Sequence, residues 1–187
     1  DKNHALYQNG VGFHLPGLKH SNQIEDHTSR AVHFAGGRVE ATVPFAQSFT
    51  VQFWLWSGII KTNEQVNNHL AELNGLNLNL INTKNDGQSK LITKFKRVDI
   101  AGIKPRCWNL VTLVSNPNGN EIWLNDVRHI DFKNDILTSD NTKEMRLVFG
   151  GTSDGKADFH GKLDEIAFFD RALTSNQIKI LYNSSIP

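Results

Sequence analysis

The chain has 187 residues, and its charged side chains nearly cancel to a formal net charge of +1 at pH 7. β-Sandwich folds reach this length as one unit, so we expect a single domain over residues 1–187. Lysine and arginine are scattered along the chain, which argues against nucleic acid as a partner. No apolar run approaches the roughly 18 residues of a membrane-spanning helix, so we expect no membrane insertion.

Residues 1–30 are polar and predict a mostly irregular N-terminal segment with one edge strand. Two apolar segments, Ala31–Phe34 and Val39–Val43, then flank Gly36 and Gly37. Because glycine adopts the positive φ angles of a tight turn at little cost, this pattern predicts a β-hairpin.

The segment Phe49–Ser57 alternates between two sets of side chains, as expected for a strand with two different faces. The set predicted to face the core is Phe49, Val51, Phe53 and Leu55. The set predicted to face away from the core is Thr50, Gln52, Trp54 and Trp56.

Further short strands, separated by turn residues, are expected along the rest of the chain. They cover Leu70–Leu73, Leu76–Ile81, Lys90–Phe95, Trp108–Ser115, Glu121–Leu124, Val127–Ile130 and Met145–Phe149. Asn125 and Asp126 predict a two-residue hairpin turn, because both residue types tolerate positive φ. Short strands at regular intervals favour a β-sandwich or a barrel.

The C-terminal stretch predicts a central strand followed by one capped helix. Leu163–Phe169 is a nearly continuous apolar run that Asp164 and Glu165 interrupt, bounded by Gly161 and by Asp170 and Arg171. Thr174 and Gln177 then have the spacing of a capping box, which marks a helix start. The apolar stripe predicted to pack on the body is Ile178, Leu181 and Tyr182.

This stretch resembles the end of a laminin G-like or pentraxin-like domain of the concanavalin A-like lectin/glucanase superfamily. The residues that match are Gly161, Leu163, Asp164, Glu165, Ile166, Arg171, Ala172, Leu173, Thr174, Leu181 and Tyr182. The resemblance implies an all-β fold, a two-sheet antiparallel jelly-roll sandwich with one short C-terminal helix. It also implies a secreted, periplasmic or cell-surface binding module, attached to a larger multidomain protein. A glycan is the first ligand class that it implies, and a protein is the second.

The resemblance further implies one structural calcium ion. Asp164 would bind it together with backbone carbonyls around Gly36 and a carboxylate such as Asp26. The sequence departs from the family pattern here, because Ala35 stands where family members commonly have an aspartate. The alternative is that Asp164 accepts hydrogen bonds from backbone N–H groups of the N-terminal loop and holds that loop without metal.

Three tryptophans share the face opposite the predicted core: Trp54, Trp56 and Trp123. Flat aromatic rings stack on sugar rings, so we expect these three to form a glycan-binding platform. The polar neighbours expected to bind sugar hydroxyls are Gln52, Glu121 and Asn125. The alternative is that loops Ile59–Asn68 and Asp131–Lys143 cover the tryptophans and make a second, minor core.

Enzymes share this fold, so the carboxylates of the sequence are candidates for a catalytic pair. Glycoside hydrolysis needs two carboxyl groups about 5–10 Å apart. Asp164 and Glu165 are adjacent on a strand and therefore point to opposite faces, which excludes them as a pair. No catalytic residue is predicted, and a glycan-active hydrolase or lyase with an unrecognised site is the alternative function.

Overall fold

The computed structural model describes residues 5–8, 10–18, 29–58, 67–82, 89–93, 100–132 and 143–186, which form fourteen strands and one helix. The strands of the N-terminal half are β1 (Leu6–Tyr7), β2 (Val11–Pro16), β3 (Arg30–Ala35), β4 (Val39–Pro44), β5 (Phe49–Ser57), β6 (Asn67–Leu73), β7 (Leu76–Asn82) and β8 (Ser89–Thr93). The C-terminal half contributes β9 (Ile100–Ile103), β10 (Trp108–Asn116), β11 (Gly119–Leu124), β12 (Val127–Phe132), β13 (Glu144–Phe149), β14 (His160–Phe169) and α1 (Ser175–Ser185).

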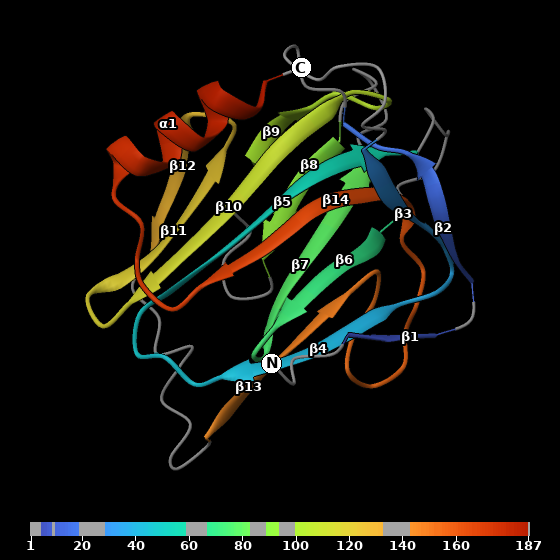
Figure 1. The fold of residues 1–187 in the computed structure, drawn as a ribbon, viewed down its shortest axis with the longest axis horizontal. Coiled ribbons are helices and arrows are strands. Elements are labelled where there is room, and N and C mark those ends of the chain that lie inside the picture. Colours follow the sequence, from blue (N-terminus) through green and yellow to red (C-terminus); the bar gives the residue numbers. More distant parts are fainter. Residues whose placement is uncertain are drawn as a thin grey trace.

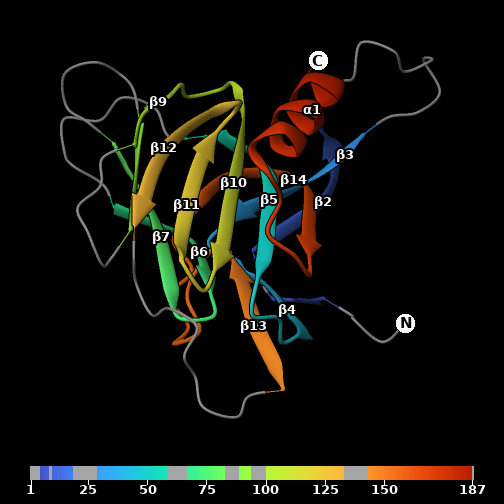
Figure 2. The same cartoon turned by 90° about the vertical axis from the view of Figure 1, so that its left-hand side faces the viewer.

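The strands form two seven-stranded antiparallel sheets (Figure 1). Sheet A has the order β1-β4-β13-β6-β7-β8-β9, and sheet B has the order β12-β11-β10-β5-β14-β3-β2. The two sheets pack face to face, and α1 lies on the outside of sheet B (Figure 2). The predicted jelly-roll sandwich with one C-terminal helix is therefore confirmed.

The main core fills the space between the two sheets. The four residues of β5 predicted to face it all lie there, and none is more than 1% exposed: Phe49, Val51, Phe53 and Leu55. The ring of Phe53 meets that of Phe149 from sheet A edge to face, with 5.6 Å between their centroids. Period-two alternation thus identified the inner face of the central strand correctly.

The hairpin predicted around Gly36 and Gly37 is wrong, although both of its strands exist. β3 pairs with β14 and β2 in sheet B, whereas β4 pairs with β13 and β1 in sheet A. Gly36, with φ of 85°, therefore belongs to a connection between the sheets rather than to a turn between paired neighbours. A hairpin and a connection between sheets give the same hydrophobic pattern in the sequence. Phe34 from sheet B and Val39 from sheet A both pack into the core between the sheets.

The N-terminal segment and the β11–β12 turn also differ from expectation. Two strands form within the N-terminal segment, β1 at the edge of sheet A and β2 at the edge of sheet B. Strand β9 was not predicted. In the β11–β12 turn, Asn125 has φ of 58° while Asp126 has no positive φ. This is the φ pattern of a type II′ turn, and the two-residue hairpin forms as predicted.

The capped helix is confirmed in detail. Thr174 is the N-cap, and its side chain and that of Gln177 make both bonds of the capping box. Ile178 is fully buried, and Leu181 and Tyr182 pack beside it against sheet B. Among the described residues no helix is both long and apolar enough to cross a membrane.

Candidate functional site

Asp164 lies at a bulge in β14 and holds the N-terminal segment against sheet B. Its side chain is 8% exposed. Oδ2 accepts hydrogen bonds from the Leu18 backbone nitrogen and the Ser29 hydroxyl, each at 2.8 Å, and Oδ1 accepts one from the Glu165 nitrogen at 2.9 Å. A Cβ at Gly17 would collide with Asp164 Oδ2, so only glycine allows the backbone this close. These contacts match the alternative interpretation of Asp164, a loop anchor.

The described residues do not fit a calcium ion at Asp164. Three donors already point at its oxygens, whereas a cation needs six or more free oxygen ligands at 2.3–2.6 Å. β14 pairs with β3 through His160↔Ala35 and Leu163↔Val32. Gly36 therefore lies on the order of 15 Å from Asp164 along the sheet.

Asp26, the third expected calcium ligand, lies outside the described residues. Within the described part of the chain, no group of three or more His, Cys, Asp or Glu side chains is placed to hold a metal ion. The calcium ion stays a prediction for which Asp164 and Gly36 offer no shared site.

The outer face of sheet B, where the tryptophan platform was expected, is covered. Trp54 is 2% and Trp123 4% exposed. Trp123 lies in a small apolar cluster with Leu173 and Ile178 of the C-terminal segment. Trp54 packs with Leu18, and its ring lies 6.0 Å from that of Tyr182. A second, minor core thus exists on this face, and Leu18 and residues of α1 contribute to it. The central residues of the two loops named in the alternative interpretation lie outside the described part of the chain.

The remaining residues of the expected platform bond within the protein. Gln52 Nε2 donates to the Thr112 hydroxyl at 2.9 Å, and Asn125 Oδ1 accepts from the Leu110 nitrogen at 2.9 Å. Glu121 accepts a hydrogen bond from Trp123 Nε1 at 2.9 Å. Trp56 is half-buried, with Lys162 Nζ 5.0 Å from its ring centroid. That these residues bind a ligand stays a prediction, and the geometry shows no open platform for it.

A different polar site lies on the outer face of sheet A. In β7 the leucines Leu76, Leu78 and Leu80 point into the core, so the alternating asparagines Asn77 and Asn79 point outward. In the neighbouring strand β6, Glu72 pairs with Asn77 and His69 with Asn79. These four side chains form the floor of a pocket.

The wall of this pocket is the loop Gly150–Asp158, which connects β13 to β14. Gly150 has φ of 83°, and a Cβ there would collide with the Phe34 ring. A Cβ at Gly151 would collide with the Lys156 carbonyl oxygen. Both glycines are therefore needed for the loop to turn back sharply over sheet A.

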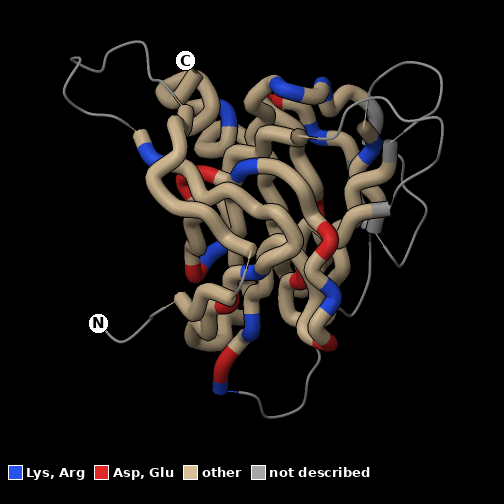
Figure 3. The backbone as a smooth tube through the Cα atoms, turned by 90° about the vertical axis from the view of Figure 1, so that its right-hand side faces the viewer, with Lys and Arg blue, Asp and Glu red and all other residues tan. Residues whose placement is uncertain are grey.

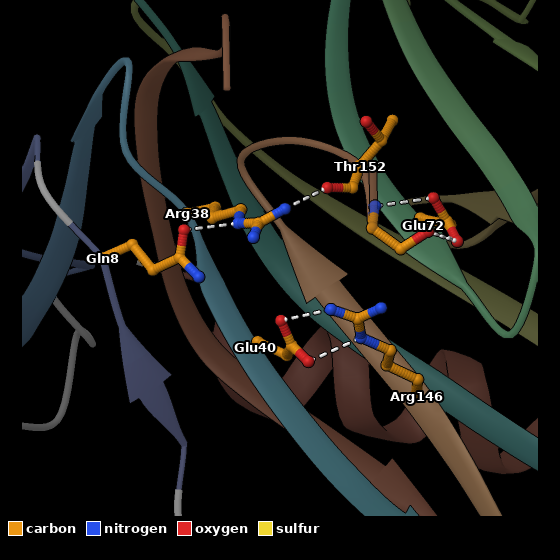
Figure 4. Close-up of polar contacts among 7 residues, drawn as sticks. Gln8, Arg38, Glu40, Glu72, Arg146 and Thr152 are labelled. Atoms are coloured by element: carbon orange, nitrogen blue, oxygen red, sulfur yellow. Dashed lines mark hydrogen bonds and ion pairs between the residues drawn. The ribbon is translucent and has the colours of Figure 1, made fainter. Parts of the chain in front are cut away.

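Hydrogen bonds fix the loop on the floor of the pocket (Figure 4). Glu72 accepts from the Ser153 nitrogen at 2.9 Å and from its hydroxyl at 2.7 Å. His69 donates its backbone N–H to Asp158 Oδ1 at 2.7 Å, and its Nδ1 lies 2.8 Å from Oδ2. Arg38 Nη1 donates to the Thr152 carbonyl at 2.6 Å. The wall is thus preorganised by contacts to strand β6 of sheet A and to Arg38, which directly precedes β4.

The pocket has a volume of about 420 Å³ and is lined by His69, Glu72, Asn77, Asn79, Thr152, Ser153, Asp154 and Lys156. This volume is within the range of small-molecule sites. The Oδ1 atoms of Asn77 and Asn79 are buried, and no described residue donates a hydrogen bond to either. A buried polar atom without a partner costs roughly 1–3 kcal/mol, so the floor of the pocket keeps these two asparagines at a cost to the stability of the fold.

Two carboxylates, Glu72 and Asp154, and one lysine, Lys156, line the pocket. A hydrogen bond from the Thr152 hydroxyl, helped by Lys156, holds the pKa of Asp154 below its usual value, so this side chain is ionised at neutral pH. Lys156 Nζ lies 3.8 Å from Asp154 Oδ2. Over the side of the molecule drawn in Figure 3, charges of both signs are interspersed.

Next to the pocket on sheet A, Glu40 and Arg146 form a bidentate ion pair with N–O distances of 2.5 and 2.7 Å (Figure 4). The hydrogen bond from Arg146 lowers the pKa of Glu40, and the same bond raises the pKa of Arg146. Arg146 is therefore committed to a protein carboxylate.

None of the pocket residues was singled out from the sequence as a site. One signal was present, because asparagine is depleted in strands and here alternates with leucine in the run Leu76–Leu80. The loop residues carried no comparable local signal, since Ser153, Asp154 and Lys156 resemble an ordinary polar turn.

Comparisons with solved structures show the same fold at low sequence identity. The receptor-binding domain of botulinum neurotoxin mosaic serotype C/D superposes with a TM-score of 0.62 at 15% identity, over 97% of this chain and 46% of that one. The binding domain of Paraclostridial Mosquitocidal Protein 1 gives 0.63 at 14% identity, over 97% and 47%. The chain thus spans about half of those binding domains.

Domain 4 of AbnA, a GH43 extracellular arabinanase from Geobacillus stearothermophilus solved in complex with arabinotriose, gives a TM-score of 0.56 at 16% identity, over 92% of this chain and 87% of that one. No curated protein sequence matches significantly. A family profile described as the concanavalin A-like lectin/glucanases superfamily matches residues 26–179. The chain therefore belongs to the concanavalin A-like lectin/glucanase superfamily.

Proposed function

We propose that this chain is a non-catalytic glycan-binding module of an extracellular, multidomain protein, and that the pocket on the outer face of sheet A is its binding site. The observation that carries the proposal is the preorganised pocket, whose described lining consists of polar side chains with amide, hydroxyl, imidazole and charged groups. Sugar hydroxyls both donate and accept hydrogen bonds, which suits such a lining.

The structural neighbours support a binding role. One is named as a toxin receptor-binding domain, and another was solved with arabinotriose bound. A further neighbour is a structure of botulinum neurotoxin type C, whose cell entry depends on interaction with two ganglioside molecules. The arabinanase neighbour is domain 4 of an extracellular protein, which supports the same context here.

The pocket favours a glycan over a protein ligand and over catalysis. A stable protein interface buries about 800 Å² on each partner, whereas this site is a small polar hollow. A glycosidase needs one carboxyl group that stays protonated at working pH. Asp154 has the opposite shift, a lowered pKa, and both oxygens of Glu72 accept hydrogen bonds from Ser153.

Calorimetric titration with an oligosaccharide panel that includes arabinotriose tests the proposal. We expect binding by the wild-type protein and loss of at least tenfold in affinity when Asn77→Ala and Asn79→Ala are combined. The matched control is Asn176→Ala, at an exposed position of α1 beside sheet B, which should bind as wild type.

Two further readouts separate the alternatives. Trp54, Trp56, Trp108 and Trp123 all belong to strands of sheet B, so ligand binding in the pocket should leave tryptophan emission unchanged. A change in emission that persists in the Asn77/Asn79 double variant would move the site to sheet B. Release of shorter sugars from any panel member would replace the binding module with a hydrolase or lyase.

A further inference from the structure

We infer that the pocket takes a neutral, hydroxyl-rich sugar and holds it by hydrogen bonds, without an aromatic stacking partner and without recognition of an acidic group. This inference rests on the proposed function and names the ligand class of the same site.

The charges around the pocket oppose an acidic sugar. Glu72 and Asp154 line it, and Asp158 supports it through His69. Lys156 is the one lysine or arginine among the described lining residues, and its Nζ lies 3.8 Å from Asp154 Oδ2. A carboxylate ligand would meet like charges that cost energy at short range.

Two arginines beside the pocket also donate their hydrogen bonds to protein acceptors. Arg38 donates to Gln8 Oε1 and to the Thr152 carbonyl, both at 2.6 Å. Arg146 donates to both oxygens of Glu40. Sites that select carboxylates typically present a guanidinium in the planar fork geometry. Figure 4 shows both guanidinium groups pointing at their protein partners instead.

A sugar hydroxyl suits the floor of the pocket, because it both donates and accepts hydrogen bonds. It can donate to the carboxylates and accept from the amide, hydroxyl and lysine groups that line the pocket. A carboxylate ligand can only accept. None of the described lining residues is Phe, Tyr or Trp, so affinity must come from hydrogen bonds and not from ring stacking.

The test compares two panels of oligosaccharides on the wild-type protein by calorimetry. One panel is neutral and includes arabinotriose and xylotriose, and the other carries uronic or sialic acids. We expect binding from the neutral panel only, with a Kd that changes less than about twofold between low and high salt, because no ligand charge is available for screening. We also expect at least a tenfold loss in the Asn77→Ala/Asn79→Ala variant and none in Asn176→Ala.

The possible failures are distinguishable. Acidic oligosaccharides that bind in the pocket and weaken with salt would overturn the neutral class while the glycan-binding function stands. Neutral binding that the double variant leaves unchanged would overturn the pocket as the site. Absence of binding from both panels would overturn the proposed function and this inference together.

Discussion

The asparagines on the floor of the pocket should lower the stability of the fold, and removing them should raise it. Asn77 and Asn79 each carry a buried oxygen that no described residue pairs. An unpaired buried polar atom costs roughly 1–3 kcal/mol, and we take the lower end because both residues are only partly buried. Valine also fits a strand better, on a scale that spans about 1 kcal/mol.

The double variant Asn77→Val/Asn79→Val should therefore gain about 1–3 kcal/mol in the free energy of unfolding while it loses glycan binding. Urea denaturation followed by circular dichroism measures the first quantity, and calorimetric titration measures the second. Thr42→Asn is the control, since it places asparagine at an exposed position of strand β4 in the same sheet. The change in the free energy of unfolding of this variant measures the low strand preference of asparagine alone.

A loss of more than about 1 kcal/mol in the double variant would refute this reasoning. It would mean that the two amides hold the sheet or the loop together, and a drop in binding would then carry no information about the site. A gain in stability with unchanged binding would leave the energetics intact and remove the asparagines from the site. Stability gained at the expense of binding is the usual signature of a functional residue.

Three further predictions concern the supports of the fold. Asp164→Asn should lower the free energy of unfolding by about 1–3 kcal/mol. Three groups donate hydrogen bonds to the Asp164 carboxylate, and the amide nitrogen of asparagine cannot accept the bond of whichever group it faces. The loss should be equal in calcium and in chelator, and a calcium-dependent rise in wild-type melting temperature that the variant lacks would reveal a metal ligand. Gly150→Ala should weaken glycan binding far more than Gly155→Ala, because both positions have positive φ but only Gly150 lacks room for a Cβ; equal effects would mean that the tight contact is unimportant. Glu40 has a lowered pKa, so its pairing with Arg146 contributes stability above the ordinary value of 4.5 and loses it as pH falls through the lower folded value. In urea titrations across this range, Glu40→Gln should cost under about 1 kcal/mol at pH 7 and nothing in strong acid, and a pH-independent difference would contradict the assignment.

Most of the strands were predictable because strand signals are local. The alternation in Phe49–Ser57 and the capping box at Thr174 each depend on residues that are neighbours in sequence. The pairing of strands is not local. The glycines after β3 look the same whether the next strand joins the same sheet or the opposite one, and the hairpin prediction failed for that reason.

The tryptophan platform failed to appear as an open surface for a related reason. Alternation correctly placed Trp54 and Trp123 on the face opposite the core, but it cannot say what lies on that face. The apolar stripe of α1 was equally visible in the sequence, with Ile178 and Tyr182 on one side of the helix. The tryptophan face and the helix stripe each predict an apolar contact, and in the structure they pack against each other.

That pairing also explains why the candidate site lies on sheet A. A sandwich has two outer faces, and here α1 and Leu18 cover much of the face of sheet B with apolar side chains. The outer face of sheet A instead carries polar residues, with Asn77 and Asn79 on β7 and Glu72 on β6. The loop that walls the pocket runs directly into β14, the strand whose Asp164 anchors the N-terminal segment on sheet B. The C-terminal stretch from β14 to α1 therefore covers the outer face of sheet B, while the loop Gly150–Asp158 that precedes it lines the candidate binding pocket on the outer face of sheet A.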